Sequence, residues 1–480
     1  MTDRIRTISS QELTAVTSCL QATGDAWTAS PPDYAHFSRA DMSKKLEQVR
    51  DAVLGETDAA NTEVEEAYQR SQYFVDSSFD FYEGLKDLGR QIQRAFLVPV
   101  RSTRDDPSDA GKGSGYASES TPLLPLLDPQ RFGISSEIRM RTIYGLPPTV
   151  LDTYLRSSDQ RETGALVLAP LYTDMVRDIC TNPTDAKQSM QLTQTVNHIL
   201  VETAAFAHHR LGAHFVGLGA TLPLLTDFGK KLKQPAGMSG LVTTTGHGGT
   251  VYMLAKTTTE VMRRSSVDSH GTIGVVGAAG SIGWSSVHTL REMLPGHKIE
   301  VFDKRTDVMR TLLAANKDLG EVQLRDSVAD IFKHNNYVVC AITEKMDLAA
   351  PEFEAIDFSA VRVIDDSQPG AVDRAQIERL GGQVFWVAGR DSSASGFMTR
   401  DGYYTDGVPY NYGESSGLCG HSTEFACGLE VATIAARGDK RNAIDRRVKY
   451  SDVKVVGNLF DEYCVEVADF QSFGKPVDIR

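Results

Sequence analysis

The chain has few cysteines, no long apolar run and no excess of basic charge. Its 6 cysteines follow neither the spacing of a zinc site nor a dense disulfide framework. No apolar run approaches the roughly 18 residues that a transmembrane helix needs, and no apolar signal-peptide core stands at the N-terminus. The net charge of -13 argues against nucleic-acid partners and anionic membranes. We therefore expect a cytoplasmic protein with free thiols and no metal site or transmembrane segment.

The strongest motif is a glycine-rich stretch at residues 271–284. Ile273, Val275 and Val276 indicate a buried strand, and a helical run from Trp284 to Met293 follows. Between them, three glycines have the spacing of a dinucleotide-binding loop. Gly277 permits a tight turn, Gly280 lets a pyrophosphate approach the backbone, and Gly283 lets helix and strand pack closely. The predicted cofactor-binding residues of the loop are Gly277, Ala278, Gly280, Ser281, Ile282 and Gly283.

The residues after the next strand bear on the choice of cofactor. The strand Lys298–Phe302 leads to Asp303, about twenty residues after the last glycine of the loop, where an acidic residue accepts hydrogen bonds from a ribose 2′-hydroxyl and favours NAD. Lys304 and Arg305 come next, where cations would hold the 2′-phosphate of NADP or simply be solvated. The sequence leaves this choice open.

Helical and strand patterns continue to alternate after this point. The apolar strands are Tyr337–Ile342, Val361–Asp365 and Val384–Val387. The alternation predicts an α/β fold, a doubly wound Rossmann-type parallel sheet. Ligands of such sheets bind at the carboxyl ends of the strands, so we expect Thr343 and the turn at residues 365–370 to lie at the cofactor crevice.

Composition and periodicity divide the rest of the chain. Apolar residues at helical spacing, which include Leu85, Leu88, Ile92 and Phe96, predict a helical N-terminal extension. The predicted divisions are a helical accessory region (1–100), a flexible linker rich in Ser, Gly, Asp and Pro (101–121), a separate α/β substrate domain (122–250), the dinucleotide-binding domain (251–416) and C-terminal helices that close onto the substrate domain (417–480).

The C-terminal third carries a candidate nucleophile. Cys427 stands near the start of a predicted helix, where the helix dipole would favour a thiolate, and His421 or Cys419 could act as base or second thiol. A cysteine nucleophile beside a nicotinamide would accept the acyl group of a thioester, and hydride transfer would release an aldehyde. A free cysteine more often packs as a small hydrophobe.

Two glycine-rich pieces precede the nucleotide motif, at residues 214–224 and 243–252. Their small residues predict backbone close to a ligand, or equally loops with tight turns. His247 lies between glycines in the second piece. It could protonate a developing alkoxide, or be a polar residue satisfied by backbone.

Four motifs in order give residues 160–435 a resemblance to the cyanobacterial fatty acyl-(acyl carrier protein) reductases, which make fatty aldehydes from acyl thioesters. They are GLGATLPL from Gly217, TTGHGGTVY from Thr244, VVGAAGSIG from Val275, and Phe425-Ala-Cys427. Departures are the extra N-terminal segment, Asp303, the tyrosine-rich insertion at 391–416, and a histidine at 247 where the family tends to have an amide residue.

The resemblance implies a site as well as an activity. It makes Cys427 the nucleophile and places His247 where the acyl group and the nicotinamide meet, with NADPH as cofactor and NAD as the alternative. From its own chemistry, we expect His247 to be a second catalytic residue. An acyl carrier protein or acyl-CoA would be the partner. The substrate-binding residues that it implies are Gly219, Thr221, Thr245 and Thr250.

Two other interpretations stay open, as does the oligomeric state. One is a non-covalent dehydrogenase of an amino, hydroxy or keto acid, in which His247 or Lys256 serves as acid/base. The other is a nucleotide-binding partner protein without activity. The basic residues of 437–449, or Lys230, Lys231 and Lys233, would either steer an acidic carrier protein or form solvated faces.

Overall fold

In this computed structural model the N-terminal third of the chain is described only in part. The described residues are 38–56, 60–87, 89, 92–100, 148–156, 161–172, 186–235, 237–267, 272–342, 344–367, 370–392, 399–400, 423–472 and 475–480. The chain divides into unit 1 (Met1–Thr244 and Met398–Ser415) and unit 2 (Thr245–Phe397 and Ser416–Arg480).

Unit 1 has a mixed sheet of six strands in the order β13-β2-β3-β1-β4-β5. Its elements are α2 (Arg39–Glu56), α3 (Asn61–Asp87), β1 (Arg94–Val100), β2 (Thr149–Arg156), β3 (Arg161–Tyr172), α8 (Ala186–Ala205), a π-helical turn (Phe206–Arg210), β4 (Phe215–Leu218), α9 (Leu222–Leu225), a 3-10 turn (Lys230–Lys233), β5 (Val242–Thr244) and β13 (Thr399–Arg400). Strand β1 runs parallel to both β3 and β4, whereas β2 is antiparallel to β3.

The helical prediction for residues 1–100 is wrong at its C-terminal end. Helices α2 and α3 occupy the middle of that range, but Arg94–Val100 forms β1, which lies between two parallel partners in the sheet. Ala95, Phe96 and Leu97 are all buried, with Ala95 and Leu97 fully so. A short apolar run that is buried on both faces has no periodicity by which a strand can be told from a helix. The pairing of this run with β3 and β4 makes it a strand.

Unit 2 alternates strands with helices or 3-10 turns from β6 to β11. Its elements are α10 (His247–Arg264), β6 (Thr272–Val276), α11 (Ser281–Met293), β7 (Lys298–Phe302), α12 (Thr306–Ala315), a 3-10 turn (Lys317–Leu319), β8 (Val322–Leu324), α13 (Val328–His334), β9 (Tyr337–Cys340), a 3-10 turn (Pro351–Phe353), β10 (Arg362–Asp365), α14 (Arg374–Arg379), β11 (Gln383–Trp386), β12 (Ala388–Asp391), β14 (Thr423–Phe425), α16 (Ala426–Arg437), a 3-10 turn (Lys440–Asn442), α17 (Tyr450–Glu462), β15 (Val465–Val467), β16 (Gln471–Ser472) and β17 (Lys475–Pro476).

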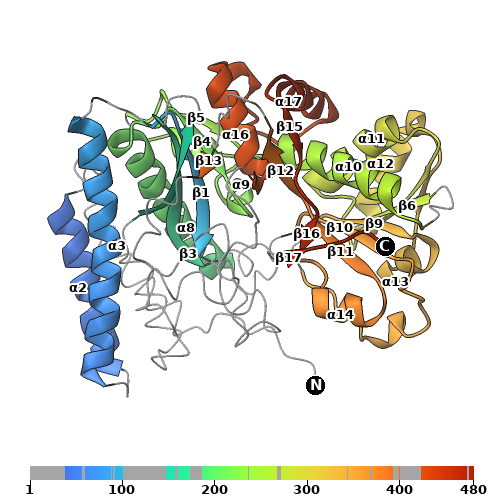
Figure 1. Cartoon of the computed structure of the whole chain (residues 1–480), viewed down its shortest axis with the longest axis horizontal. Coiled ribbons are helices and arrows are strands. Elements are labelled where there is room, and N and C mark those ends of the chain that lie inside the picture. Colours follow the sequence, from blue (N-terminus) through green and yellow to red (C-terminus); the bar gives the residue numbers. More distant parts are fainter. Residues whose placement is uncertain are drawn as a thin grey trace. The chain divides into compact units, whose positions relative to one another are not determined.

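The main sheet of unit 2 is the predicted Rossmann-type sheet. Its order is β11-β10-β9-β6-β7-β8, and every neighbouring pair is parallel. The first strand, β6, therefore lies at the centre, and the chain winds outward first through β7 and β8 and then through β9, β10 and β11. Helices lie on both faces, α10 and α11 on one and α13 and α14 on the other (Figure 1).

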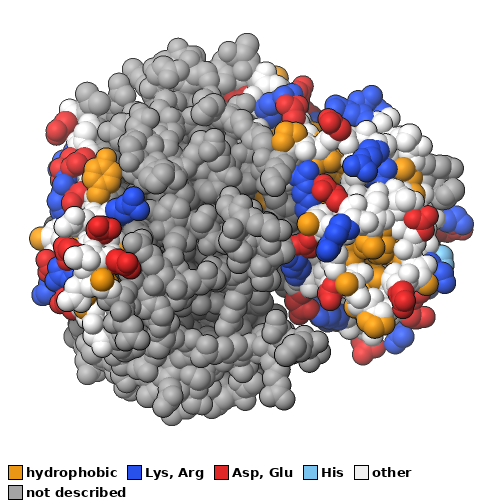
Figure 2. Space-filling view, turned by 60° about the horizontal axis from the view of Figure 1, so that its bottom comes forward, with side chains coloured by type: hydrophobic (Ala, Val, Ile, Leu, Met, Phe, Trp, Pro, Cys, Tyr) orange, Lys and Arg blue, Asp and Glu red, His pale blue; other side chains and the backbone are white. Residues whose placement is uncertain are grey.

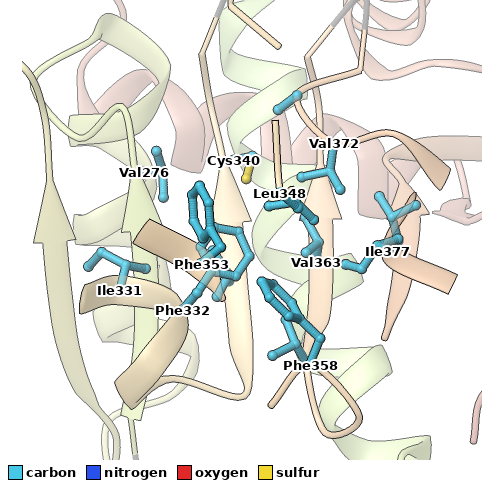
Figure 3. Close-up of a cluster of buried hydrophobic side chains, with 14 residues drawn as sticks. Val276, Ile331, Phe332, Cys340, Leu348, Phe353, Phe358, Val363, Val372 and Ile377 are labelled. Atoms are coloured by element: carbon cyan, nitrogen blue, oxygen red, sulfur yellow. The ribbon is translucent and has the colours of Figure 1, made fainter. Parts of the chain in front are cut away.

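Three phenylalanines fill the core under one face of this sheet. Figure 3 shows the rings of Phe332, Phe353 and Phe358 grouped beside the β9 and β10 side chains. Phe332 is 5.8 Å from Phe353 and 5.6 Å from Phe358 between ring centroids, at tilted or edge-on angles that aromatic pairs favour. Cys340 is fully buried among them, and burial raises the pKa of its thiol well above the ordinary value, so it packs as a small hydrophobe.

The boundary between the units differs from the predicted one. Unit 2 begins at Thr245, whereas the sequence predicted a substrate domain that continues to residue 250. Helix α10 starts at His247 and packs on α11, α16 and α17, so its first turn belongs with the Rossmann sheet. Residues 416–480 also belong to this unit.

Two predicted segments cannot be compared with the structure. The linker at 101–121 and most of the insertion at 391–416 lie outside the described residues. Among the helices that the structure describes, none has the length and apolar character needed to cross a membrane. In Figure 2, basic, acidic and hydrophobic side chains are interspersed over the described surface of the face shown.

Candidate functional site

The glycine loop after β6 has the geometry that the motif predicts. Gly277 has φ of +84°, and a Cβ there would lie 2.3 Å from the carbonyl oxygen of Ala341. A Cβ at Gly283 would lie 2.1 Å from the Gly277 oxygen, so only glycine lets α11 pack this closely on the loop. A Cβ at Gly280 would meet only the loop's own backbone, at 3.1 Å or more. One side of the loop is therefore open to a ligand, which fits a dinucleotide diphosphate.

Asp303 is bound to the glycine loop rather than standing alone at the end of β7. Its Oδ2 accepts a 2.9 Å hydrogen bond from the Ala279 amide, and its Oδ1 accepts from the Arg305 amide and Nε at 2.9 and 3.0 Å. Burial opposes ionisation of this carboxyl, but the hydrogen bonds from Arg305 and Ala279 outweigh it and lower the pKa of Asp303. Asp303 is therefore a carboxylate at neutral pH.

The two cations considered for a 2′-phosphate already have acidic partners. Arg305 is paired with Asp303 at 3.0 Å, and the Lys304 ammonium is paired with Glu344. Both side chains are largely exposed. Each of these two cations thus lies beside one carboxylate, so the four charges balance.

The second glycine-rich piece serves helix packing. A Cβ at Gly246 would lie 2.3 Å from the Cβ of Cys427, and one at Gly249 would lie 2.5 Å from the Ala426 oxygen. The small residues at the start of α10 thus let it meet the first turn of α16 at backbone distance. This contact brings His247 and Cys427, the two residues predicted to be catalytic, to the same place in unit 2.

A buried carboxylate joins the same two helices. Glu430 lies one turn after Cys427 on α16 and is 0% exposed. It accepts a hydrogen bond from the Gly249 amide at 2.7 Å and one from the Gly246 amide at 3.2 Å. These are amides at the N-terminus of α10, where the helix dipole favours a negative charge.

The thiolate expected at Cys427 is not what the surroundings favour. Burial raises the pKa of the Cys427 thiol well above its ordinary value, and the nearby carboxylates Asp366, Glu424 and Glu430 raise it further. The hydrogen bond from the Gly428 amide acts in the opposite direction but is outweighed. The prediction that the helix start favours a thiolate is therefore wrong for the net effect, because burial and the carboxylates brought in by the fold raise the pKa of Cys427.

Asp366, whose charge acts on Cys427, lies at the carboxyl edge of the Rossmann sheet. It follows β10 directly, and its amide donates to the carbonyl oxygen of Cys340 at the end of β9. Burial, and after it the charge of Asp365, raise the pKa of Asp366 well above its ordinary value. A partly buried carboxyl of this kind accepts a proton more readily than an ordinary one.

His247 is buried and electrically neutral at neutral pH. Burial lowers its pKa to about 4. Its amide donates to the Oγ1 of Thr245, and the Thr245 amide donates to the Ile444 oxygen at 3.0 Å. Thr245 and Thr250 are themselves buried, at 1% and 3% exposure. An imidazolium that protonates an alkoxide is therefore not favoured, and a neutral N–H donor is.

The structure gives no role in this site to the other predicted residues that it describes. Gly219 and Thr221 belong to unit 1, where a Cβ at Gly219 would lie 2.9 Å from the Leu97 oxygen of β1. Lys256 pairs at 3.0 Å with Asp461 on α17, which also accepts from Tyr252, so it is engaged in helix packing. Thr343, Cys419 and His421 lie outside the described residues.

Three of the six basic residues at 437–449 form ion pairs with acidic side chains. Arg437 is paired with Glu462, Arg441 with Asp439 at 2.7 Å, and Arg446 with Asp452 at 2.6 Å. These pairs reduce the net positive charge that a carrier protein would meet. Within the described ranges, no group of three or more His, Cys, Asp or Glu residues could hold a metal ion.

Glu430 and Asp366 escaped prediction from sequence. The sequence predicted only an apolar helix around Glu430. The signal that would have identified it is a charged residue within a helix that is otherwise apolar and buried. Asp366 was predicted only as part of a turn at the strand ends. Neither residue's proximity to Cys427 follows from spacing along the chain.

No protein-family model and no curated protein sequence match the chain. Among solved structures, one of the subunits of dipicolinate synthase from Bacillus halodurans is similar with a TM-score of 0.26 and 19% identity, over 39% of this chain and 60% of that chain. L-tryptophan dehydrogenase from Nostoc punctiforme has a TM-score of 0.29 and 10% identity, over 78% of this chain and 90% of that chain. The chain thus spans less than two thirds of the synthase polypeptide. Likenesses this weak assign no activity, and the fold class rests on the strand order of unit 2.

Proposed function

We propose that this protein is an NAD(P)H-dependent oxidoreductase whose dinucleotide binds at the glycine loop of unit 2. The observation that carries the proposal is the loop itself, placed after the central strand of a doubly wound sheet. Gly277 and Gly283 have no room for a side chain, and the side of Gly280 is open. This is the arrangement in which backbone amides and a helix N-terminus bind a diphosphate.

The proposed reaction is reduction of an acyl thioester to an aldehyde. The Cys427 sulfur would attack the thioester carbonyl, a carbon–sulfur bond to Cys427 would form, and the carrier thiol would leave with a proton. A bound reduced nicotinamide supplies the hydride for the release of aldehyde. Support comes from the place of Cys427 beside Asp366, at the carboxyl edge of β10 in the unit that holds the glycine loop.

The raised pKa of Cys427 means that this thiol needs a base. Asp366 is the carboxyl with the strongest electrostatic effect on Cys427, and its own raised pKa suits it to accept the proton. Glu430 would position the sulfur by clamping α16 to the first turn of α10. His247 would donate a hydrogen bond as a neutral imidazole.

For the cofactor, the surroundings of Asp303 support NADH over the NADPH that the resemblance implies. An ionised, buried carboxylate would repel a 2′-phosphate, and its neighbouring cations are already paired. The acyl carrier, carrier protein or CoA, is proposed from the resemblance alone.

A second candidate is a dehydrogenase that acts on an amino, hydroxy or keto acid without a covalent intermediate. The raised pKa of the Cys427 thiol favours it, because a protonated thiol is a weak nucleophile. Asp366 would then be the acid or base, since Lys256 is held by Asp461.

Intact-protein mass spectrometry separates these candidates. The wild-type protein and Cys427→Ala are mixed with acyl-carrier-protein and acyl-CoA thioesters without a dinucleotide. An acyl adduct on the wild type alone, discharged to aldehyde by NADH, supports the thioester reductase. If no thioester gives an adduct while NADH still binds, the covalent route is rejected in favour of the second candidate.

A further inference from the structure

The connection between α16 and α17 packs directly on the glycine loop. The Val448 amide donates to the Ser281 Oγ at 3.2 Å, and the Ser285 Oγ donates to the Val448 oxygen at 3.1 Å. Ser281 and Ser285 lie on the first turns of α11, the helix that starts at the loop. Two hydrogen bonds thus fix the backbone at Val448 against the start of that helix.

Arg447, the residue before this anchor, extends its side chain to the loop. Its Nη2 donates a 2.8 Å hydrogen bond to the carbonyl oxygen of Ala279. The residue is exposed as a whole, and a guanidinium has five N–H donors in a fixed plane. One donor is used by the loop carbonyl, so others remain for an anion at the same loop.

The two basic neighbours of Arg447 are engaged differently. Arg446 is paired with Asp452 at 2.6 Å, and the Lys449 amide donates to the same carboxylate at 2.9 Å. Neither of these contacts involves the glycine loop. Of the two neighbouring arginines, Arg447 is therefore the one whose guanidinium donates to the loop.

The ligand that fits is a diphosphate. The amides at the start of α11 carry no side-chain cap, and the open side of Gly280 leaves backbone accessible. A diphosphate there would bring negative charge next to the Arg447 guanidinium. That guanidinium is positioned by its hydrogen bond to Ala279 and by the anchored backbone of Val448, the next residue. Arginine binds phosphate oxygens through two parallel N–H donors, with a gain in both energy and orientation.

We propose that Arg447 binds the diphosphate of the dinucleotide, so that the connection between α16 and α17 forms part of the phosphate site. The assignment rests on the proposed dinucleotide site and not on the thioester chemistry. It gives one residue of the C-terminal basic segment a role in cofactor binding instead of in docking a carrier protein.

The test compares ADP with adenosine, because the two share a base and ribose and differ in the diphosphate. Their affinities are measured by calorimetry or ligand-observed NMR for wild type, Arg447→Gln and Arg447→Lys, with Arg446→Gln as matched control. Thermal melts establish that each variant is folded. We expect Arg447→Gln to weaken ADP binding about tenfold, Arg447→Lys to weaken it less, and adenosine binding to stay unchanged in all variants.

The outcomes separate this assignment from the site on which it rests. Unchanged ADP affinity in folded Arg447→Gln overturns the role of Arg447 alone. Equal weakening of ADP and adenosine also overturns it, since Arg447 would then shape the loop without binding phosphate. Failure of the wild-type protein to bind ADP overturns the dinucleotide site itself. A loss of ADP affinity in Arg446→Gln as large as in Arg447→Gln rejects the specific contact in favour of general charge.

Discussion

At the scale of single residues, the candidate site of unit 2 is distinguished by ionisable groups that the fold buries. Cys427, Asp366 and His247 each have a pKa displaced from its ordinary value, and burial is the first cause in each case. The displacement makes the thiol harder to ionise, the carboxyl a better proton acceptor and the imidazole neutral. Such displaced groups gather at functional sites more often than elsewhere.

Replacement of Asp366 tests the coupling to the thiol. At the pH where Cys427 ionises, Asp366 is a carboxylate, and its charge raises the pKa of the thiol. In Asp366→Asn this charge is gone, so the midpoint of the pH profile for alkylation of Cys427 should move to lower pH. The rate is followed by mass spectrometry of the peptide that contains Cys427, which separates it from the exposed Cys464.

The fully exposed Asp307 provides the control, as Asp307→Asn. Its profile should match that of the wild type. An identical profile in Asp366→Asn would show that the two groups do not interact.

Replacement of His247 tests its burial as a neutral imidazole. With a pKa of about 4 in the folded state and 6.5 in the unfolded state, the unfolded state binds more protons between these values. Stability should therefore fall as pH falls from about 6.5 to about 4, by at most about 3 kcal/mol.

This part of the acid sensitivity should be absent from His247→Gln. Urea unfolding of both proteins at pH 7 and pH 4.5 gives the comparison, in which the other titrating groups cancel. Equal losses of unfolding free energy on acidification would contradict a buried neutral His247.

At the scale of elements, the close approach of α10 and α16 organises the candidate site. Gly246 and Gly249 allow the approach, and Glu430 holds it through two amides of α10. The sequence predicted backbone close to a ligand, or loops with tight turns, for this glycine-rich piece, and helix packing is an adequate explanation of its glycines. The functional consequence is indirect, because the same contact positions Cys427.

Gly249→Ala should separate the two helices. The new Cβ would lie 2.5 Å from the Ala426 oxygen, which is backbone and cannot move alone. We expect destabilisation of about 1–3 kcal/mol, measured by chemical denaturation. Gly296→Ala is the matched control, since no atom lies within 4 Å of its added Cβ, and it should change stability by less than about 0.5 kcal/mol. Similar stabilities in the two variants would argue against tight packing at Gly249.

At the scale of the whole molecule, a ligand of the native state should raise the unfolding temperature of the unit that binds it. A dinucleotide at a hundred times its Kd stabilises the native state by about 2.7 kcal/mol. Because Asp303 is ionised and its neighbouring cations are paired, we expect NADH to raise Tm more than NADPH at equal concentration. Asp303→Asn should narrow the difference. A larger rise with NADPH in the wild type would show that Lys304 and Arg305 leave their partners to hold the 2′-phosphate.

Most of the fold of unit 2 followed from local sequence. The strand Lys298–Phe302 was predicted at its observed bounds, and the strands at β6, β9, β10 and β11 within one or two residues at each end. Apolar runs bounded by turns specify these strands because the sheet buries them on both faces. The same reasoning failed at β1, where periodicity indicated helix for a central strand.

The sequence by itself determined the glycine loop after β6 and the Rossmann-type order of elements, because both depend on residues close together in the chain. Only the tertiary structure decided what surrounds Cys427. Asp366 and Glu430 reach it through the packing of β10, α10 and α16, and burial with these carboxylates reversed the sign of its pKa shift. The contact of Arg447 with Ala279 joins residues far apart in the chain. Desolvation and long-range contacts exist only in the folded chain, so no local pattern encodes them.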